Sequence, residues 1–353
     1  MDEGTFIRMI RDKPDDDGPR LVFADWLEEQ GDADRAEFIR IQIELSRTDT
    51  AQPRWLELTE REQELQRRHR QMWLNPFGNW VWEARFRRGM VEALEVSAQS
   101  FLQHWPALLD RLPIRELRLY DVEDHAATLA ACPGLAAIHV LDLGRNFAEG
   151  AWLVTFMESP HLHAIQTLDL SGNYLVGEDV STVFESHTLS SLRSLRLSHN
   201  ALGGGSFLGV TARPPRLESL DLSHNRLRPV GAQELAATPL LSGLRVLDLS
   251  TNELEPAGAH ELTASPYLAQ LTDLRLSSNA IGDGGAISLA NASNLMGLER
   301  LALAGNLIGA RGARALAQSQ HLAGLRYLDL RKNRFARNEA RLLRRRFADQ
   351  VAL

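Results

Sequence analysis

A repeated pattern of apolar residues that ends in asparagine constrains this chain more than any other feature. The pattern is Leu-x-x-Leu-x-Leu-x-x-Asn-x-Leu, and Leu244, Leu247, Leu249, Asn252 and Leu254 show it in full. Its asparagines are Asn146, Asn173, Asn200, Asn225, Asn252, Asn279, Asn306 and Asn333. Six of the seven intervals between them are 27 residues and one is 25. Because so regular a period leaves little room for chance, we interpret the chain as a tandem array.

Each unit of the array combines a strand, a turn and a helix. The central Leu-x-Leu alternates with period two, which predicts a short strand with its leucines on one side. The asparagine then turns the chain, and its amide can bond backbone groups left unpaired between neighbouring coils. Gly231-Ala232 followed by Leu235-Ala236 is typical of the second half and predicts a helix. One such coil cannot bury its leucines alone, whereas stacked coils form a continuous core.

These units resemble leucine-rich repeats, and a 27-residue unit with a full helix resembles the ribonuclease-inhibitor subtype. The resemblance covers roughly residues 90–335 and implies an α/β horseshoe, with a parallel sheet inside and helices outside. Two degenerate units, Val91-Leu94-Val96 and Ile114-Leu117-Leu119, precede the eight clear ones. We therefore expect a solenoid of about ten repeats over residues 86–336.

Residues 1–85 differ in composition, because they contain five of the seven tryptophans and read as helical. Pro14-Asp15-Asp16-Asp17 and the stretch from Pro19-Arg20 to Glu29 resemble the bacterial repeat-companion domain, which precedes leucine-rich and other repeats. This resemblance covers about residues 3–47 and brings no established chemistry. An exposed solenoid end needs a cover. We therefore expect residues 1–85 to form an all-α N-terminal cap.

The last segment, residues 337–353, is expected to be a C-terminal capping helix. Leu342, Leu343, Phe347 and Val351 would pack on the last coil. Residues 331–353 contain 8 basic and 2 acidic residues, so this end is locally positive. A solvated capping helix is the favoured interpretation, and a patch for a nucleic acid or an acidic partner is the alternative.

The overall composition argues against several classes of function. The formal net charge is −7, whereas nucleic-acid binders usually carry a basic surface. Cys132 is the single cysteine, so a disulfide framework and a Cys-rich zinc site are excluded. The start, Met1-Asp2-Glu3-Gly4, lacks a basic region before an apolar run, and no stretch of about 18 apolar residues exists. We expect a bacterial, cytoplasmic protein that makes no membrane contact.

The residue between the last two leucines of each unit should point to the inner face, about 4.8 Å from its equivalent in the next unit. In order these residues are Glu95, Arg118, Asp142, Asp169, Arg196, Asp221, Asp248, Arg275, Ala302 and Asp329. One interpretation is a structural ladder in which flanking carboxylates share each arginine, and the other is contact with a partner. The two are compatible, because an exposed ion pair contributes only about 0–1 kcal/mol.

Two further rows adjoin this one. The next row is small, with Ser171, Ser198, Ser223, Ser250 and Ser277, which leaves the floor of the face accessible. His199 and His224 occupy equivalent places in consecutive repeats, so their side chains should approach each other. A metal site there lacks a third ligand dictated by spacing, and two surface histidines are the favoured interpretation. No phosphate loop, HExxH motif, dinucleotide fingerprint or nucleophile elbow is present, so we expect no enzyme and no cofactor.

The sequence therefore predicts a non-enzymatic scaffold or adaptor that binds a protein on its concave face. The expected contact residues are Asp142, Arg145, Asp169, Arg196, His199, Asp221, His224, Asp248, Arg275, Arg300, Tyr327, Asp329 and Arg331. Two alternatives stay open. Ribonuclease-inhibitor-type repeats also occur in GTPase-activating proteins, which can supply an arginine in trans. The chain could also inhibit an enzyme by covering its active site.

Overall fold

The structure is a computed structural model that describes residues 2–208, 210 and 215–353, so Met1 lies outside the described residues. It divides into two compact units, unit 1 (Met1–Asp142) and unit 2 (Leu143–Leu353). Within the described residues no helix combines the length and the apolar character that crossing a membrane would need.

Unit 1 opens with helices, as the sequence predicts. They are α1 (Glu3–Asp12), α2 (Gly18–Glu29), α3 (Ala33–Arg47) and α4 (Pro53–Leu74). Asp2 caps α1, because its carboxylate accepts a hydrogen bond from the Thr5 backbone N–H at 2.9 Å. Phe6, Ile7 and Phe23 are buried in one cluster that joins α1 to α2 and α3. The same cluster includes Met90, so the core of the helices continues into the strands that follow.

The helices of unit 1 lead into four strands and their connections. In chain order, these elements are η1 (Asn75–Trp80), β1 (Val81–Arg87), β2 (Met90–Ser97), α5 (Ala98–Arg111), β3 (Glu116–Tyr120), η2 (Glu123–His125), α6 (Ala126–Ala130), η3 (Pro133–Ala137) and β4 (Val140–Asp142). Strand β1 pairs with β2 antiparallel, whereas β2, β3 and β4 are parallel. The two predicted degenerate repeats are present in register, with Leu94 opposite Leu117. The antiparallel strand β1 spans the predicted boundary at residue 85.

Two contacts join the helices of unit 1 to its sheet. Arg20 on α2 is fully buried and forms an ion pair with Glu92 on β2, which is 3% exposed. At the β1–β2 turn, Gly89 has a φ of +83°, and a Cβ atom added there would lie 2.5 Å from the Cα atom of Ile39 on α3. Only glycine therefore fits this turn, and α3 packs directly on its backbone.

Unit 2 repeats one strand and one outer segment per coil. Its strands are β5 (Thr167–Asp169), β6 (Ser194–Arg196), β7 (Ser219–Asp221), β8 (Val246–Asp248), β9 (Asp273–Arg275), β10 (Arg300–Ala302), β11 (Tyr327–Asp329) and β12 (Val351–Ala352). Every neighbouring pair is parallel. Strands β2 to β11 correspond to the ten predicted repeats.

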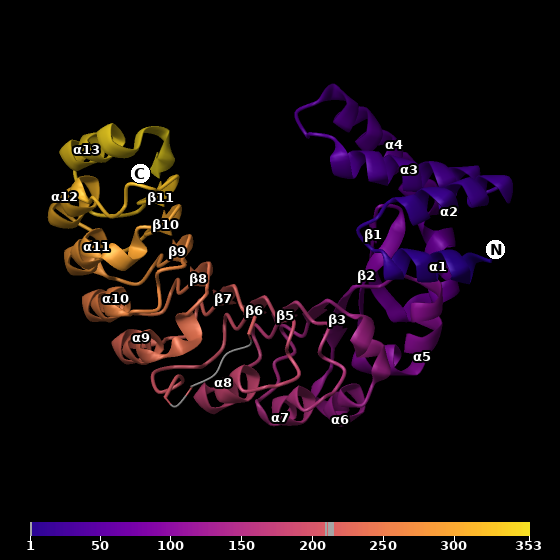
Figure 1. The fold of residues 1–353 in the computed structure, drawn as a ribbon, viewed down its shortest axis with the longest axis horizontal. Coiled ribbons are helices and arrows are strands. Elements are labelled where there is room, and N and C mark those ends of the chain that lie inside the picture. Colours follow the sequence, from indigo (N-terminus) through magenta and orange to yellow (C-terminus); the bar gives the residue numbers. More distant parts are fainter. Residues whose placement is uncertain (1, 209, 211–214) are drawn as a thin grey trace. The chain divides into compact units, whose positions relative to one another are not determined.

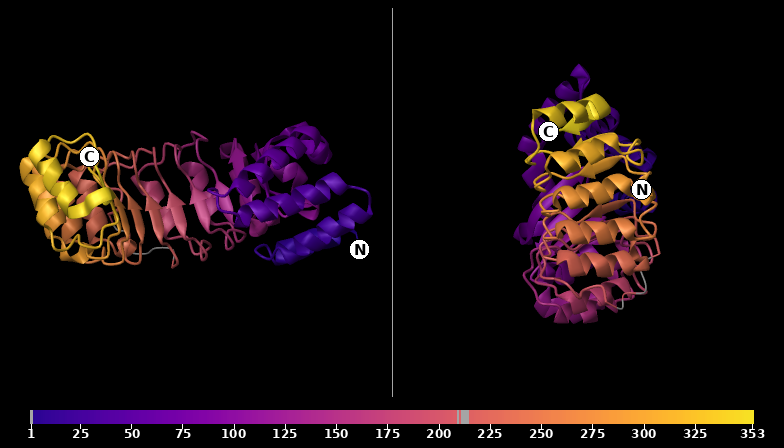
Figure 2. Two further views of the ribbon diagram at one scale, coloured as in Figure 1. Left: turned by 90° about the horizontal axis from the view of Figure 1, so that it is seen from above. Right: turned by 90° about the vertical axis from the view of Figure 1, so that its left-hand side faces the viewer.

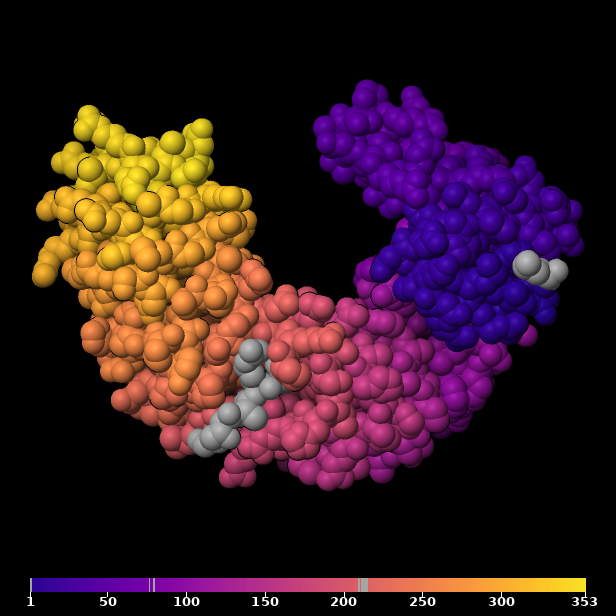
Figure 3. All heavy atoms as spheres, in the orientation of Figure 1, coloured from indigo at the N-terminus to yellow at the C-terminus, as the bar shows by residue number. Residues whose placement is uncertain are grey.

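The outer segments of unit 2 are mostly helical. They are α7 (Ala151–Met157), α8 (Gly177–Phe184), α9 (Arg228–Ala237), η4 (Pro239–Leu241), α10 (Glu255–Ala264), α11 (Gly282–Asn291), η5 (Ser293–Leu295), α12 (Ala310–Gln318), α13 (Arg337–Phe347) and η6 (Ala348–Gln350). Within unit 2 the helices lie on one side and the strands on the other (Figure 1). Helices α9 to α13 stack one above another (Figure 2), and adjacent coils are in contact on the visible surface (Figure 3). The predicted α/β leucine-rich repeat fold is confirmed.

The asparagine ladder works as predicted. In Asn252, which is buried, Nδ2 donates to the Leu222 carbonyl at 2.9 Å and to the Leu249 carbonyl at 3.0 Å. Its Oδ1 accepts from the Asn225 backbone N–H at 2.9 Å. The amide therefore bonds backbone groups of its own coil and of the preceding coil. Asn173 and Asn279 repeat this arrangement.

The C-terminal segment differs from a simple capping helix. Leu343 and Phe347 are buried, as predicted, and Leu342 is half-buried. The helix ends at Phe347, and the chain then adds the strand β12, which pairs parallel with β11. The Leu330 backbone N–H donates to the Ala352 carbonyl at 2.7 Å. A two-residue strand has no periodic signal, which is why the sequence did not reveal it.

Candidate functional site

The strands of unit 2 present one row of side chains to the core and two rows to the opposite side. Because strand residues alternate, burial of Leu168, Leu195 and Leu220 turns their neighbours away from the helices. We call this opposite side the strand face, and it also includes the turn that follows each strand. Its predicted members are Arg145, Asp169, Arg196, His199, Asp221, His224, Asp248, Arg275, Arg300, Tyr327, Asp329 and Arg331.

The predicted charged row is divided between the two units. Glu95, Arg118 and Asp142 lie in unit 1, where Arg118 is opposite Asp142 and its Nε lies 3.6 Å from the carboxylate. The other seven positions are in register within unit 2. Asp142 therefore belongs to unit 1, apart from the other twelve predicted contact residues. Arg145 is exposed in unit 2, at the turn before the first described strand of that unit.

Two adjacent carboxylates lie at the centre of the strand face. Asp221 is directly opposite Asp248, and each accepts a hydrogen bond at 2.9 Å from the backbone N–H of the serine two residues later. Burial raises the pKa of Asp248, and the nearby Asp221 carboxylate acts in the same direction. The Arg275 guanidinium, 3.6 Å from Asp248, opposes that rise. In this pair, two carboxylates lie on neighbouring strands with no arginine between them.

An arginine-rich group adjoins the acidic pair and contains a residue that the sequence reasoning missed. Asp273 is buried, and it binds Arg275 at 2.9 Å and Arg300 at 3.4 Å. Arg300 also lies over the Tyr327 ring, with its guanidinium carbon 5.1 Å from the ring centre. Asp273 comes directly before the buried Leu274, in the same row as Arg300 and Tyr327. The sequence could have revealed Asp273 if this second row had been aligned across the repeats.

The expected sharing of each arginine by two flanking carboxylates holds in part. Arg275 contacts two carboxylates, Asp248 and Asp273. Arg196 pairs with Asp169 at 3.4 Å, and the described residues show no second pair for it. Arg331 binds Asp329 at 2.5 Å, and its hydrogen bonds hold the pKa of Asp329 below the usual range. The arginine side chains stay largely exposed, so their charges face outward.

His199 and His224 meet as predicted. Their rings stack with centres 4.0 Å apart and planes 12° apart. Both residues have positive φ, 55° and 58°, at the turn that precedes each ladder asparagine. Burial lowers the pKa of His224, and His199 acts in the same direction, whereas Asp221 and Asp248 oppose it. His224 therefore resists taking up a proton.

Replacing His199 by glutamine is expected to raise the pKa of His224, because the electrostatic effect of His199 that opposes protonation of His224 is then absent. In the wild type, the lowered pKa means that the unfolded chain binds the proton first as pH falls. The stability from this group is therefore present above about pH 6.5 and is lost as pH falls toward the folded pKa. NMR titration of the ring protons measures the shift. His260→Gln, on α10, should leave His224 unchanged, and an unchanged His224 in the His199→Gln variant would contradict the coupling.

Unit 1 carries an aromatic group that the sequence reasoning did not single out. Trp82 on β1 is 56% exposed, and its ring lies 4.5 Å from that of Tyr120 on β3. Arg118 lies over the same Tyr120 ring, and the Tyr120 hydroxyl donates to Glu95 at 2.8 Å. A clustering of tryptophan was visible in the sequence, but the pairing of β1 with β2 was not.

The described residues show no group of three or more His, Cys, Asp or Glu side chains arranged to hold a metal ion. Cys132 is buried in unit 1, and burial raises the pKa of its thiol. These features indicate that Cys132 is a small core residue and not a reactive thiol.

Comparison with known proteins supports the repeat assignment. The leucine-rich repeat family matches residues 188–205, 215–236, 269–290 and 296–317. No curated protein matches the chain. Similar solved structures include an internalin from Listeria monocytogenes, which is 22% identical over 70% of this chain and 69% of its own, with a TM-score of 0.42.

Two other solved structures also match 70% of this chain. A protein from Bacteroides fragilis is 12% identical over 76% of its own chain, with a TM-score of 0.48. The TLR13–ssRNA13 complex is 18% identical over 36% of the TLR13 chain, with a TM-score of 0.44. Together, the matched segments, the strand register and the asparagine ladder identify the array as leucine-rich repeats within an α/β fold.

Proposed function

We propose that the strand face of unit 2 binds a partner protein and that the chain serves as a scaffold or adaptor without catalysis. The observation that carries this proposal is the order of charge along the face. A carboxylate pair, Asp221 and Asp248, adjoins two exposed arginines, Arg275 and Arg300, that both bind Asp273. The small serines beside them leave both accessible to a partner.

The chemistry of the strand face specifies the partner in outline. A basic side chain of the partner would meet Asp221 and Asp248, and an acidic one would meet Arg275 and Arg300. Arginine and tyrosine dominate binding energy in many protein interfaces, so Arg300 and Tyr327 are the proposed anchors. The existing ion pairs do not prevent this, because exposed pairs are weak enough to be exchanged for pairs with the partner.

The finer identity of the chain is part of the same proposal. The 27-residue unit with helices α9 to α12 supports a ribonuclease-inhibitor-like subtype, and the motif around Arg20 supports a bacterial repeat-companion module in unit 1. The net charge of −7 favours a protein partner over a nucleic acid and is compatible with a cytoplasmic adaptor.

Affinity capture from native cell extract tests the proposal. Reversing the acidic pair with Asp221→Arg and Asp248→Arg is expected to lower recovery of the wild-type partner at least about tenfold, because like charges then face each other. The matched control is Glu158→Arg with Glu178→Arg, which makes the same change of charge at exposed positions at the end of α7 and the start of α8. Equal recovery by both double variants would contradict binding on the strand face.

A further inference from the structure

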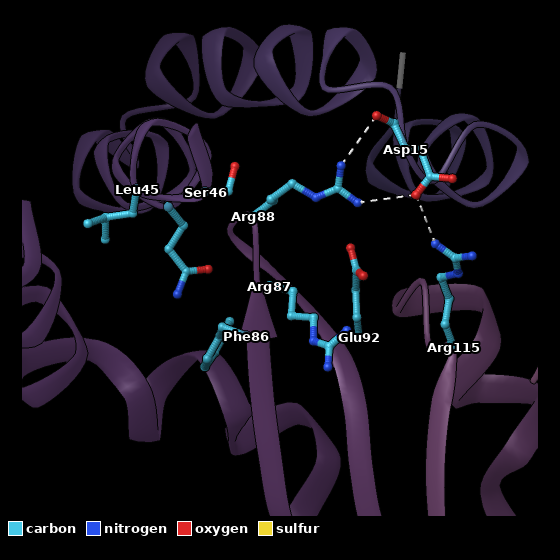
Figure 4. Close-up of a pocket in the computed structure, with 9 residues that line it drawn as sticks. Asp15, Leu45, Ser46, Phe86, Arg87, Arg88, Glu92 and Arg115 are labelled. Carbon is cyan, nitrogen blue, oxygen red and sulfur yellow. Dashed lines mark hydrogen bonds and ion pairs between the residues drawn. The ribbon is translucent and has the colours of Figure 1, made fainter. Parts of the chain in front are cut away.

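A pocket of about 480 Å³ lies within unit 1. Its walls come from four places: the β1–β2 hairpin, helix α3, the loop before α2 and the segment before β3 (Figure 4). The lining residues are Asp15, Gln42, Leu45, Ser46, Phe86, Arg87, Arg88, Glu92 and Arg115. A volume of this size falls within the range of known ligand sites, roughly 300–1,000 Å³.

The residues that line the pocket carry one more positive than negative charge among themselves. Three are arginines, Arg87, Arg88 and Arg115, and two are carboxylates, Glu92 and Asp15. Glu92 is already neutralised, because the fully buried Arg20 binds it. Arg87 and Arg88 have partners outside the lining, Glu116 at 2.7 Å and Asp17 at 3.2 Å. These contacts hold the guanidinium groups in place at the mouth of the pocket.

Asp15 contributes the remaining carboxylate, and it is loosely held. Its side chain is 87% exposed and lies 3.4 Å from Arg115 and 3.8 Å from Arg88 (Figure 4). By contrast, the side chain of Arg115 is 23% exposed, and its Nε atom is buried with no hydrogen-bond partner among the described residues. A buried donor without a partner is costly. The pocket therefore holds an exposed carboxylate at a place where a second, better-seated oxyanion would be stabilised.

We propose that this pocket binds an acidic side chain of an extended peptide segment, which displaces Asp15 from Arg88 and Arg115. A carboxylate suits a guanidinium pair because both can form charge-assisted hydrogen bonds. The half-buried Phe86 and Leu45 offer an apolar wall for a neighbouring side chain of the peptide. Both polar atoms of the Gln42 amide already have partners, because Oε1 accepts from the Gly89 backbone N–H at 2.7 Å and Nε2 donates to Glu62 at 2.8 Å. All of the lining residues belong to unit 1, so this proposal does not depend on the strand face of unit 2.

The test uses the full chain and a fluorescein-labelled peptide, Gly-Leu-Glu-Leu-Gly, with its Gln copy as the neutral probe. Fluorescence anisotropy at low salt follows binding up to about 1 mM peptide. Arg115→Gln is expected to weaken binding about tenfold through loss of one charge-assisted bond. Asp15→Asn is expected to tighten it several-fold, because the competing carboxylate is gone. The neutral probe should not bind.

Arg85→Gln is the matched control, because Arg85 is an exposed arginine of the same hairpin outside the pocket lining. It should change the Kd less than twofold, and thermal unfolding should show that each variant folds. Weaker binding by Asp15→Asn, or equal binding of the Glu and Gln peptides, would overturn the proposal. Competition by acetate or inorganic phosphate at the concentration of the peptide would also overturn it, because the pocket would then be a free-anion site.

Discussion

Replacing Arg20 by methionine is expected to lower the free energy of unfolding of unit 1 by about 3–5 kcal/mol, the usual cost of breaking a buried ion pair on one side. Arg20 is fully buried and Glu92 is 3% exposed, so the variant leaves a carboxylate in the interior without its cation. Urea unfolding followed by tryptophan fluorescence measures the change, since residues 1–85 contain five of the seven tryptophans.

The double variant Arg20→Met with Glu92→Met separates pairing from packing. It removes both charges, so it should recover most of the loss, whereas Glu92→Met alone should be destabilising because Arg20 is then buried alone. Arg85→Gln removes the 3.8 Å surface contact with Glu116 and should cost less than about 1 kcal/mol. A double variant no more stable than either single variant would show that the two groups do not act as a pair.

Asn252→Ala is expected to lower the free energy of unfolding of unit 2 by about 3–5 kcal/mol, because each buried backbone group left without a partner costs about 1–3 kcal/mol. The amide serves the carbonyls of Leu222 and Leu249, and its oxygen also accepts from the Asn225 and Leu227 backbone N–H groups. Alanine replaces none of these bonds. Chemical denaturation followed by circular dichroism gives the global effect.

Hydrogen exchange places the Asn252 effect within the structure. The backbone N–H groups of Asn225 and Leu227 should lose protection in Asn252→Ala, since their acceptor is gone. Ser250→Ala is the control, because the Ser250 backbone N–H keeps its bond to Asp248 and only a half-buried hydroxyl is lost. Unchanged protection at both amides would rule out the asparagine as the source of the stability.

Most of the structure of unit 2 could be predicted from the repeat period, because each coil is determined by residues close together in the sequence. Leu247, Leu249 and Asn252 each follow from spacing within one coil, and stacking of like coils then determines the register. The β1–β2 hairpin did not follow from spacing, since its turn depends on Arg88 and Gly89, both with positive φ. The Arg20–Glu92 pair joins residues 72 apart in the sequence, and no periodic pattern reports such a contact.

The candidate site was predicted as a row of equivalent positions in successive repeats. The repeat period determines which residues share such a row, so this part of the site follows from the sequence. The register of Asp221, Asp248 and Arg275 on neighbouring strands agrees with that prediction. The sequence did not predict Asp273 as a contact residue, because it lies in the row next to the charged one. Its neighbours in that row are Val246 and Arg300, one apolar and one basic, so the row shows no repeated residue type. The sequence did not predict the pocket around Asp15 and Arg115, because its walls come from four separate segments of the chain.

The antiparallel hairpin has a consequence for how this segment can be moved between proteins. A graft that ended at residue 85 would cut β1 before Arg87 and leave β2 behind. It would also carry Arg20 without Glu92, and α3 without the Gly89 turn on which it packs. A transferable piece must therefore run at least through Ser97, and Arg11 on α1 also donates to the Leu109 carbonyl on α5 at 2.8 Å. Recombination that exchanges the helical segment among repeat proteins should carry the first parallel strand with it.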